Sequence, residues 1–557
     1  MNKFIQVLPI KKNNFIKIII ITCFIYYSVL GFSILDSENF SWLQEEDFAH
    51  AYIGWLFFKG TPWTMPLGMN PDYGLELASS IIYTDSIPLF ALVFKAFSPL
   101  LSSDFQYFGY WLFFCIFMQT LFGMKLIGLF TTNNKIIFLG SILFALSPPM
   151  IWRMQVHLTL AGHFLILAAI YLALQPGLKN RSLKWLILLN TSILVHAYFF
   201  AMVLAIWLAD LAGKFTMHSI RFKYIIISLL ITIFSVGITA WLSGYFSVGT
   251  GIGAHGFGYW RMNVFSIVDS DGWSYILKDI PGGAGDYEGF NFLGTGIIFM
   301  ILAGLIKINY WKSYIPKILK RFWSLLILFF LLTIFALSHN VGIGSYDINI
   351  EVNDHLLKLA NIFRSSGRFF WPIHYMLVLF SIFVILKYYP KNITVILILL
   401  AIIIQYLDTS SGWLKIREMH EISSQEKWEI RMKDSFWEDV PKRYSKIRYI
   451  PAGNQLEHWK SIAYYAIKKN LSTDSIYMAR VKSGAISESN SKASEMLESG
   501  KFENDSIYLM DKNSFEKAIP NVNPTKDLSV IIDGFHVIAP GWIECLECNT
   551  DLKKASS

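Results

Sequence analysis

The chain has 557 residues, of which 54% are hydrophobic and only 16% carry a charge, and its mean hydropathy is +0.44. Soluble globular proteins contain about 25% charged residues, so this composition, together with long apolar runs, favours a membrane protein over a soluble one. The net charge of +8 does not indicate nucleic-acid binding, because most Lys and Arg residues lie in short loops between apolar runs, where positive charge orients membrane proteins.

The N-terminal segment predicts an uncleaved membrane helix. Four lysines lie within the first 17 residues, and an apolar run follows to Leu35 without a clear small-residue cleavage site. We therefore expect a helix over 15–35 with a cytoplasmic N-terminus, in the inner membrane of a bacterium. The next stretch, 36–104, is rich in Trp, Tyr, Pro and acids and predicts an outer loop with interfacial or re-entrant elements.

About eleven membrane-spanning helices are predicted. When these spans alternate in direction, every short loop rich in Lys or Arg falls on one side, which places two further outer loops at 244–290 and 339–368. The transmembrane domain then covers 1–408, and its last span ends in the periplasm. The predicted spans are 15–35, 105–130, 136–152, 158–175, two within 185–213, 224–243, 291–306, 322–338, 369–387 and 392–408.

Residues 409–557 are charged and polar and predict a soluble periplasmic domain. Four short β-like runs and intervening helix-like runs indicate a small α/β fold. The β-like runs are 446–451, 475–480, 506–510 and 528–533. Cys545 and Cys548 form a single CxxC pair, which fits a disulfide, a minor metal site or an incidental pair.

The first candidate site lies just after the first predicted helix. On a short interfacial helix over 43–58, Asp47, His50 and Gly54 would share one face, and Glu46 would also lie beside His50. A carboxylate beside an imidazole can bind a substrate or take a proton from an acceptor hydroxyl. The alternative is an amphipathic surface helix whose acids face water.

Asp85, in the string Tyr83-Thr84-Asp85-Ser86, is a second carboxylate on the same predicted side. It would pair with Asp47 to position an acceptor, or help to hold a divalent cation such as Mg²⁺ or Mn²⁺. The alternative is a simple helix N-cap, a position that Asp favours.

Three polar residues, Arg153, His157 and His163, are predicted at the outer ends of the third and fourth spans. The two histidines are six residues apart and would not share a helix face, so a zinc pair is not predicted. His163, next to Gly162, is the candidate for a functional role, whereas His157 fits a hydrogen-bonded interfacial histidine.

The segment Arg364-Ser365-Ser366-Gly367-Arg368 predicts a phosphate clamp, because guanidinium groups match phosphate oxygens and glycine lets the backbone approach. The alternative is a pair of arginines anchored at the lipid headgroups. The Gly-rich stretch 281–289, which contains Glu288, fits either a flap over a site or a turn-rich connector, and it lacks the Gly-Lys-Ser/Thr of a P-loop.

Several of these strings resemble the GT-C superfamily of membrane glycosyltransferases, which use polyprenyl-phosphate-linked sugars. The resemblance includes the acidic motif Glu46-Asp47 after the first helix, the Ser-Pro turn of 146–153 and the His-Tyr turn of 194–198. Over about 36–410 the chain looks more closely like an uncharacterised bacterial family described as GT-C-like. The strings of that closer match are 47–50, 83–88 and 363–372.

The resemblance implies roles for individual residues. Asp47 would be the general base of an inverting displacement, with His50 beside it, and Asp85 would support the acceptor or a metal. Arg364 and Arg368, with Ser365, would stabilise the departing lipid phosphate. Residues in supporting positions would be Glu46, His163 and Glu288. The sequence has no clean Asp-x-Asp motif, so the resemblance leaves a metal requirement open.

The implied partners are a polyprenyl-phosphate-linked sugar, membrane lipids and an envelope acceptor that is a lipid, a glycan or a protein. A transporter or lipid flippase is an alternative, although such proteins place charges near the bilayer midplane and often contain two related halves. A noncatalytic envelope-assembly protein that acts through its C-terminal domain is a third interpretation.

Overall fold

The computed structural model describes residues 12–548, apart from position 78, residues 176–179, 250–254, 313–314 and 426–427, and positions 429 and 483. The chain forms two compact units. The first unit comprises Met1–Asn39, Tyr107–Thr239 and Gly253–Ser424. The second unit comprises Phe40–Gln106, Ala240–Ile252 and Gln425–Ser557.

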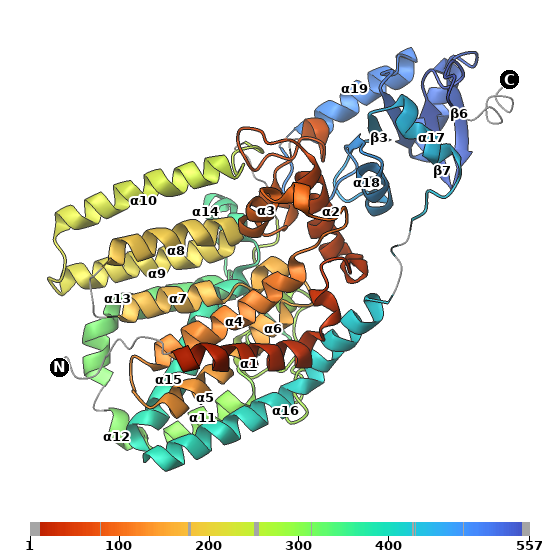
Figure 1. Ribbon diagram of the computed structural model, residues 1–557. Helices are drawn as coiled ribbons and strands as arrows, with labels where there is room; N and C mark the ends of the chain where they lie inside the picture. Colours follow the sequence, from red (N-terminus) through yellow and green to blue (C-terminus); the bar gives the residue numbers. More distant parts are fainter. Residues whose placement is uncertain are drawn as a thin grey trace. The chain divides into compact units, whose positions relative to one another are not determined.

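The first unit is a bundle of helices with a short β-hairpin, β1 (Asn340–Ile343) and β2 (Tyr346–Asn349), whose strands pair antiparallel. Figure 1 shows α7, α8, α9 and α10 running side by side. The helices of this unit, including most of α10, are α1 (Lys12–Leu30), α4 (Phe108–Ile127), α5 (Asn134–Ala145), α6 (Pro148–Trp152), α7 (Phe164–Leu174), α8 (Arg181–Val195), α9 (Ala197–Thr216), α10 (Phe222–Leu242), α11 (Thr295–Leu305), α12 (Ile308–Trp311), α13 (Ile315–Leu337), α14 (Asp354–Ala360), α15 (Trp371–Tyr388) and α16 (Lys391–Ser423).

Small residues let the helices of this bundle approach closely. A Cβ added at Gly140 of α5 would lie 2.6 Å from a methyl group of Ile127 on α4, and one at Gly296 of α11 would lie 2.1 Å from the carbonyl oxygen of Ala401 on α16. Packing through small residues is typical of helices that associate in a membrane. These glycines therefore set the spacing of the bundle.

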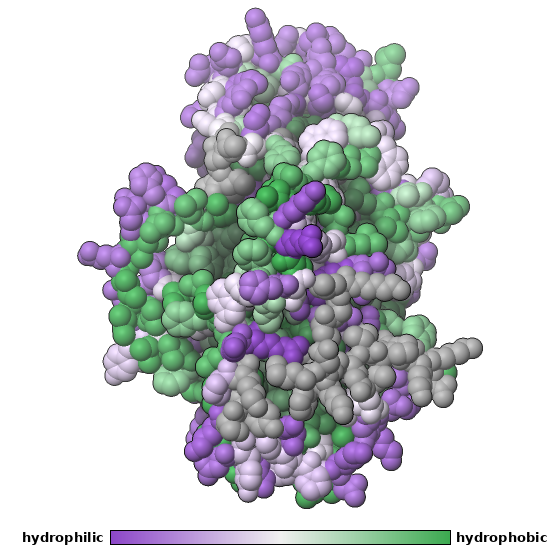
Figure 2. All heavy atoms as spheres, turned by 90° about the vertical axis from the view of Figure 1, so that its left-hand side faces the viewer, coloured by the Kyte–Doolittle hydropathy of each residue, from purple (hydrophilic) through white to green (hydrophobic). Residues whose placement is uncertain are grey.

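Each predicted span contains a helix, but the count of about eleven spans is not confirmed. Several helices, such as α5, α7 and α11, have only 11 or 12 residues, whereas a bilayer core requires about 20. Large hydrophobic side chains are exposed on the long helices (Phe234 on α10 is 71% exposed), and Figure 2 shows many hydrophobic residues on one face of the molecule. Among the described residues, six helices are long and apolar enough to cross a membrane: Phe108–Ile127, Ala197–Thr216, Phe222–Leu242, Ile318–Leu337, Ser366–Tyr388 and Lys391–Ser423.

Helix α16 continues past the predicted domain boundary at 408. Asp408 is buried within the helix, and its carboxylate accepts hydrogen bonds from the hydroxyls of Ser274 and Thr295 at 2.6 and 2.7 Å. The backbone N–H groups of Tyr275 and Ile276 donate to the same carboxylate. The carboxylate of Asp408 therefore holds the loop that precedes α11. Helix α16 ends only at Ser423.

The second unit contains the predicted small α/β domain, built on a five-stranded sheet of order β4-β3-β5-β7-β6. Strand β3 pairs parallel with β4 and β5, and β7 pairs antiparallel with β5 and β6. The elements of this domain are α17 (Phe436–Arg443), β3 (Lys446–Ile450), α18 (Trp459–Lys468), β4 (Ser472–Thr473), α19 (Ala485–Ser499), β5 (Ser506–Met510), α20 (Lys512–Ala518), β6 (Leu528–Ile532) and β7 (Phe535–Ala539). Near its end, Cys545 and Cys548 form a disulfide.

One predicted strand of this domain is wrong. Residues 475–480 do not extend a strand beyond the isolated bridge of Ile476, because their backbone groups bond elsewhere. The side chain of Asn454 both accepts from the N–H of Met478 and donates to its carbonyl, each at 2.8 Å. Strand β7 was not predicted.

Besides Ala240–Ile252, the rest of the second unit is mainly the first predicted outer loop. It contains α2 (Glu46–Gly60), α3 (Pro88–Lys95) and the short 3₁₀ turn η4 (Ile81–Thr84). The predicted interfacial helix over 43–58 corresponds to α2. This helix packs against η4, α3 and α18, so the outer loop and the C-terminal domain share one compact unit.

Candidate functional site

Three buried charged residues of the first unit form what we call the arginine cluster: Arg153, Glu288 and Arg368. Arg153 Nη2 donates to Glu288 Oε2 at 2.8 Å and to the Glu288 carbonyl oxygen at 3.1 Å. Arg368 donates from Nε and Nη2 to both carboxylate oxygens of Glu288, at 2.8 and 2.9 Å. His157 Nε2 lies 3.7 Å from Glu288 Oε1. One carboxylate therefore holds two guanidinium groups.

Local sequence explains how these residues meet. Arg153 follows α6, which begins with two prolines that suit the first turn of a helix. Glu288 and Arg368 lie in short 3₁₀ turns, and each is next to a glycine. A Cβ added at Gly367 would lie 2.5 Å from the Cα of Gly289, so only glycine permits this approach of the two backbones. The close contact brings Glu288 against Arg368.

The charges of the arginine cluster do not balance. Burial opposes the ionisation of Glu288, but the charges of Arg153 and Arg368 outweigh it and hold the pKa of Glu288 well below its usual value. Burial lowers the pKa of Arg153 to about 10, partly offset by Glu288, so that Arg153 stays charged at neutral pH. The cluster therefore carries two positive charges for one negative charge.

Unsatisfied polar atoms gather beside the cluster. Arg153 is 1% exposed, and its Nη1 has no hydrogen-bond partner among the described residues. The Arg153 guanidinium lies 5.3 Å from the ring centre of Trp371, and the centre of the His163 ring lies 4.2 Å from the same point. Trp371 Nε1 and His163 Nε2 also lack partners within the described part of the chain. Buried polar atoms are normally paired, so this grouping indicates a place for a polar ligand or ordered water.

The other predicted residues of this unit lie around the cluster. His163 caps the start of α7, and its Nδ1 lies 2.7 Å from the hydroxyl of Tyr375. Ser365 is buried, and its backbone N–H donates to the Tyr198 hydroxyl at 2.9 Å. Arg364 is exposed, with its guanidinium 4.7 Å from the ring centre of Trp260, whereas Arg368 is buried. The two arginines of the predicted clamp thus have different surroundings.

The Gly-rich stretch 281–289 is fastened at Gly283, Gly285 and Asp286, although residues 281–284 are exposed. Asp286 accepts hydrogen bonds from Arg261 Nε at 3.1 Å and Asn263 Nδ2 at 2.9 Å, and Gly283 N–H donates to the same carboxylate. A Cβ at Gly285 would lie 2.2 Å from the carbonyl oxygen of Tyr259. The contacts of Gly285 and Asp286 therefore hold the end of the stretch that carries Glu288.

In the second unit, α2 brings the first predicted site against η4. His50 is buried, its Nε2 lies 3.1 Å from the carbonyl oxygen of Tyr83, and its ring stacks on Tyr477 with centres 4.4 Å apart. A Cβ at Gly54 would lie 2.4 Å from Thr84 Cβ, which explains the glycine. Asp47 is half-buried near the start of α2, and the side chain of Glu46 lies outside the described part of the structure.

Asp85 follows η4 and is half-buried, with a left-handed backbone (φ 51°). It does not cap α3, because the N-cap position is occupied by Ile87. Burial raises the pKa of Tyr245, and the nearby charge of Asp85 adds to this effect. The structure therefore brings the segments that carry Asp47, His50 and Asp85 together within the second unit, whereas Arg364, Ser365 and Arg368 belong to the first.

The C-terminal domain contributes residues to this region that the sequence did not single out. The N–H of Ala479 donates to the Tyr83 carbonyl at 2.8 Å, and the N–H of Tyr477 donates to the Tyr73 hydroxyl at 3.0 Å. Tyr477 thus lies on His50 while its backbone is bound to the outer loop. A lone tyrosine in a polar segment gives no sequence signal of this role.

A second group of charges, which we call the carboxylate network, links the outer loop to the sheet: Glu76, Arg448, Asp474 and Glu503. Arg448 donates to both oxygens of Glu76 at 3.0 and 2.9 Å and lies 3.7 Å from Asp474 and 3.4 Å from Glu503. Burial raises the pKa of Asp474 to about 7, although the Tyr449 N–H and the charge of Arg448 oppose the change.

Among the residues that the structure describes, no three His, Cys, Asp or Glu side chains are placed to hold one metal ion.

Fold and site define a mainly helical protein with membrane-type helices, a buried arginine cluster and a small α/β domain. Two family models match the sequence: a domain of unknown function, DUF6311, over residues 19–410, and the DUF6311 C-terminal domain over residues 436–540. The chain belongs to the DUF6311 family. No curated protein matches it.

Proposed function

We propose that this protein is a membrane glycosyltransferase of the GT-C type. It would transfer a sugar from a polyprenyl-phosphate-linked donor to an envelope lipid, glycan or protein. The reaction would take place at the outer face of a bacterial inner membrane, with the N-terminus in the cytoplasm and the C-terminal domain in the periplasm.

The observation that carries the proposal is the buried guanidinium of Arg153, which shares the carboxylate of Glu288 with Arg368. A guanidinium group does not deprotonate at neutral pH, so a buried Arg153 donor that Glu288 does not reach suits a bound anion. Arg153 Nη1 is a buried donor without a described partner. A phosphate group matches guanidinium donors in geometry and charge.

The chemistry follows from these groups. Asp47 takes the proton of the acceptor hydroxyl, the hydroxyl oxygen bonds to the anomeric carbon, and the bond from that carbon to the donor phosphate breaks. The electron pair leaves with the phosphate, where the arginines stabilise the developing charge. His50 lies on the same helix as Asp47, and Asp85 follows η4, which packs against that helix; both would orient the acceptor.

The test is mass spectrometry of lipids that co-purify with the full-length protein. We expect Asp47→Asn to retain an unreacted polyprenyl-phosphate sugar, while wild type retains less of it or the spent lipid phosphate. Arg153→Met should lose the bound phosphate lipid, because the substitution removes the buried Nη1 donor and its charge. Glu38→Gln, which changes an exposed acid near the first helix, is the matched control and should equal wild type.

The proposal fails if neither wild type nor Asp47→Asn carries a polyprenyl lipid and envelope glycans are unchanged in cells that express the variant. Equal retention of an intact lipid-linked sugar by both proteins, again with unchanged glycans, would favour a lipid flippase instead.

A further inference from the structure

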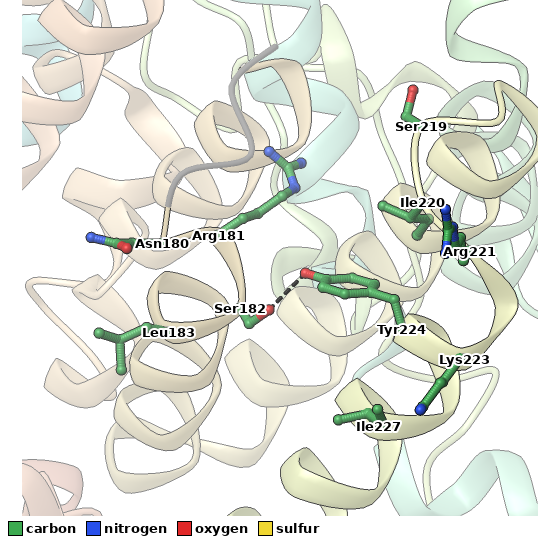
Figure 3. Close-up of a pocket in the computed structure, with 10 residues that line it drawn as sticks. All are labelled: Asn180, Arg181, Ser182, Leu183, Ser219, Ile220, Arg221, Lys223, Tyr224 and Ile227. Carbon is green, nitrogen blue, oxygen red and sulfur yellow. Dashed lines mark hydrogen bonds between the residues drawn. The ribbon is translucent and has the colours of Figure 1, made fainter.

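A groove between α8 and α10 in the first unit lies apart from the residues discussed above. A cavity of about 630 Å³ is bounded by the start of α8 and by the α9–α10 turn with the first turns of α10 (Figure 3). A second cavity of about 280 Å³ shares Ser182, Leu183, Tyr224 and Ile227 with the first and continues along the same two helices. Together the two cavities form one groove, which we call the α8–α10 groove.

One end of the α8–α10 groove is cationic. Arg221 and Lys223 are exposed and line this end of the groove. Neither side chain forms an ion pair with a described residue. Arg181 also lines this end, but Asp210 neutralises it through hydrogen bonds of 3.1 and 2.6 Å. No described lining residue is acidic. Two uncompensated positive charges therefore remain at this end.

The remainder of the α8–α10 groove is apolar. Its walls are formed mainly by aliphatic and aromatic side chains, and α10 is one of the six helices long and apolar enough to cross a membrane. From Tyr224 to Thr232 the groove follows α10 over about 12 Å, at 1.5 Å per residue. The apolar lining residues are Leu183, Trp185, Leu186, Trp207, Ile227 and Ile231.

Hydrogen bonds hold the two helices at this separation. The hydroxyls of Ser182 and Tyr224 lie 2.7 Å apart, and Figure 3 shows Tyr224 reaching from α10 toward α8. Farther along, Asn190 donates to the Ser235 hydroxyl at 3.0 Å and accepts from the Thr239 hydroxyl at 2.6 Å. The gap between these bridges is therefore a fixed feature of the fold.

We infer that the α8–α10 groove binds an anionic phospholipid of the membrane. The lipid phosphate lies against Arg221 and Lys223, and one acyl chain lies between α8 and α10. Basic pockets between membrane helices commonly bind anionic lipid headgroups, and an acyl chain suits the apolar walls. This site is independent of the proposed sugar transfer, because it shares no residue with the arginine cluster or with the Asp47 region.

The test uses the full-length protein in nanodiscs of phosphatidylcholine doped with a small fraction of phosphatidylglycerol, with bound lipid counted by native mass spectrometry. Arg221→Gln/Lys223→Gln should reduce retained phosphatidylglycerol about tenfold. Ile227→Trp, which fills the groove without changing its charge, should reduce the retention of both lipids. The matched control is Lys135→Gln/Lys391→Gln, which removes two exposed cations at the starts of α5 and α16 and should retain phosphatidylglycerol as wild type does.

Thermal unfolding of each variant checks that it is folded. The inference is overturned if the control variant loses as much phosphatidylglycerol as Arg221→Gln/Lys223→Gln, since the attraction would then come from surface charge in general. It is also overturned if folded Ile227→Trp retains both lipids at the wild-type level.

Discussion

The arginine cluster and the carboxylate network are both built around a buried charge, but their excess charges have opposite signs. The arginine cluster has two cations for one anion, whereas the carboxylate network surrounds Arg448 with three carboxylates. A carboxylate can relieve excess negative charge by binding a proton, as the raised pKa of Asp474 indicates. An arginine has no such route at neutral pH. Of the two groups, only the carboxylate network can therefore reduce its excess charge by binding a proton near neutral pH.

The largest expected effect is from Glu288→Gln. The substitution removes the carboxylate charge that Arg153 and Arg368 share, and loss of one partner of a buried ion pair costs about 3–5 kcal/mol. Thermal unfolding of the purified protein in detergent measures the change. Glu76→Gln is the control, because Glu76 is half exposed and an exposed ion pair contributes only about 0–1 kcal/mol. Equal destabilisation by the two substitutions would contradict the distinction between the two groups.

Asp474→Asn should change how stability depends on pH. The folded-state pKa of Asp474 is raised from 3.8 to about 7, so between these values the folded state binds a proton that the unfolded state has released. This group then stabilises the fold below about pH 4, and that contribution is lost as pH rises to about 7, at about 1.4 kcal/mol per pH unit. Asn cannot titrate, so the free energy of unfolding of the variant does not fall in this way as the pH rises.

The measurement is the unfolding of wild type and Asp474→Asn, followed by tryptophan fluorescence at several pH values. Between about pH 5 and pH 7 we expect the variant to gain roughly 2 kcal/mol relative to wild type, from the linkage slope above. Parallel pH profiles for the two proteins would show that Asp474 does not hold a proton in the folded state. The excess negative charge would then be relieved in some other way.

The sequence predicted more of the helices than of the contacts between charges. Apolar runs located the longer helices of the bundle but not α12 and α14, which lie in predicted loops, and the change in composition near 410 located the α/β domain. The interfacial helix with His50 was also correctly placed as α2. These features depend on local composition and periodicity, which a single sequence contains.

The partners of the charged residues could not be predicted, because they depend on contacts between distant segments. Arg153 and Glu288 are 135 residues apart, and the packing of Gly289 against Gly367 decides that Arg368 joins them. The spacing of Arg364 and Arg368 suggested a shared partner, but a 3₁₀ turn rather than an α-helix begins between them. Arg368 and Glu288 were separate candidates in the sequence, but nothing in it indicated that they pair with each other and with Arg153.

The smallest effect on stability is expected from Arg364→Gln, which removes a cation next to the arginine cluster but not part of it. Arg364 is exposed, so the free energy of unfolding should change by less than about 0.5 kcal/mol. If the buried arginines hold the donor phosphate, Arg364→Gln should retain more co-purified lipid phosphate than Arg153→Met does, as measured by mass spectrometry. The opposite order would place the phosphate at the exposed arginine over Trp260. The excess charge of the buried cluster would then need another explanation, such as an ordered water network around Arg153 Nη1.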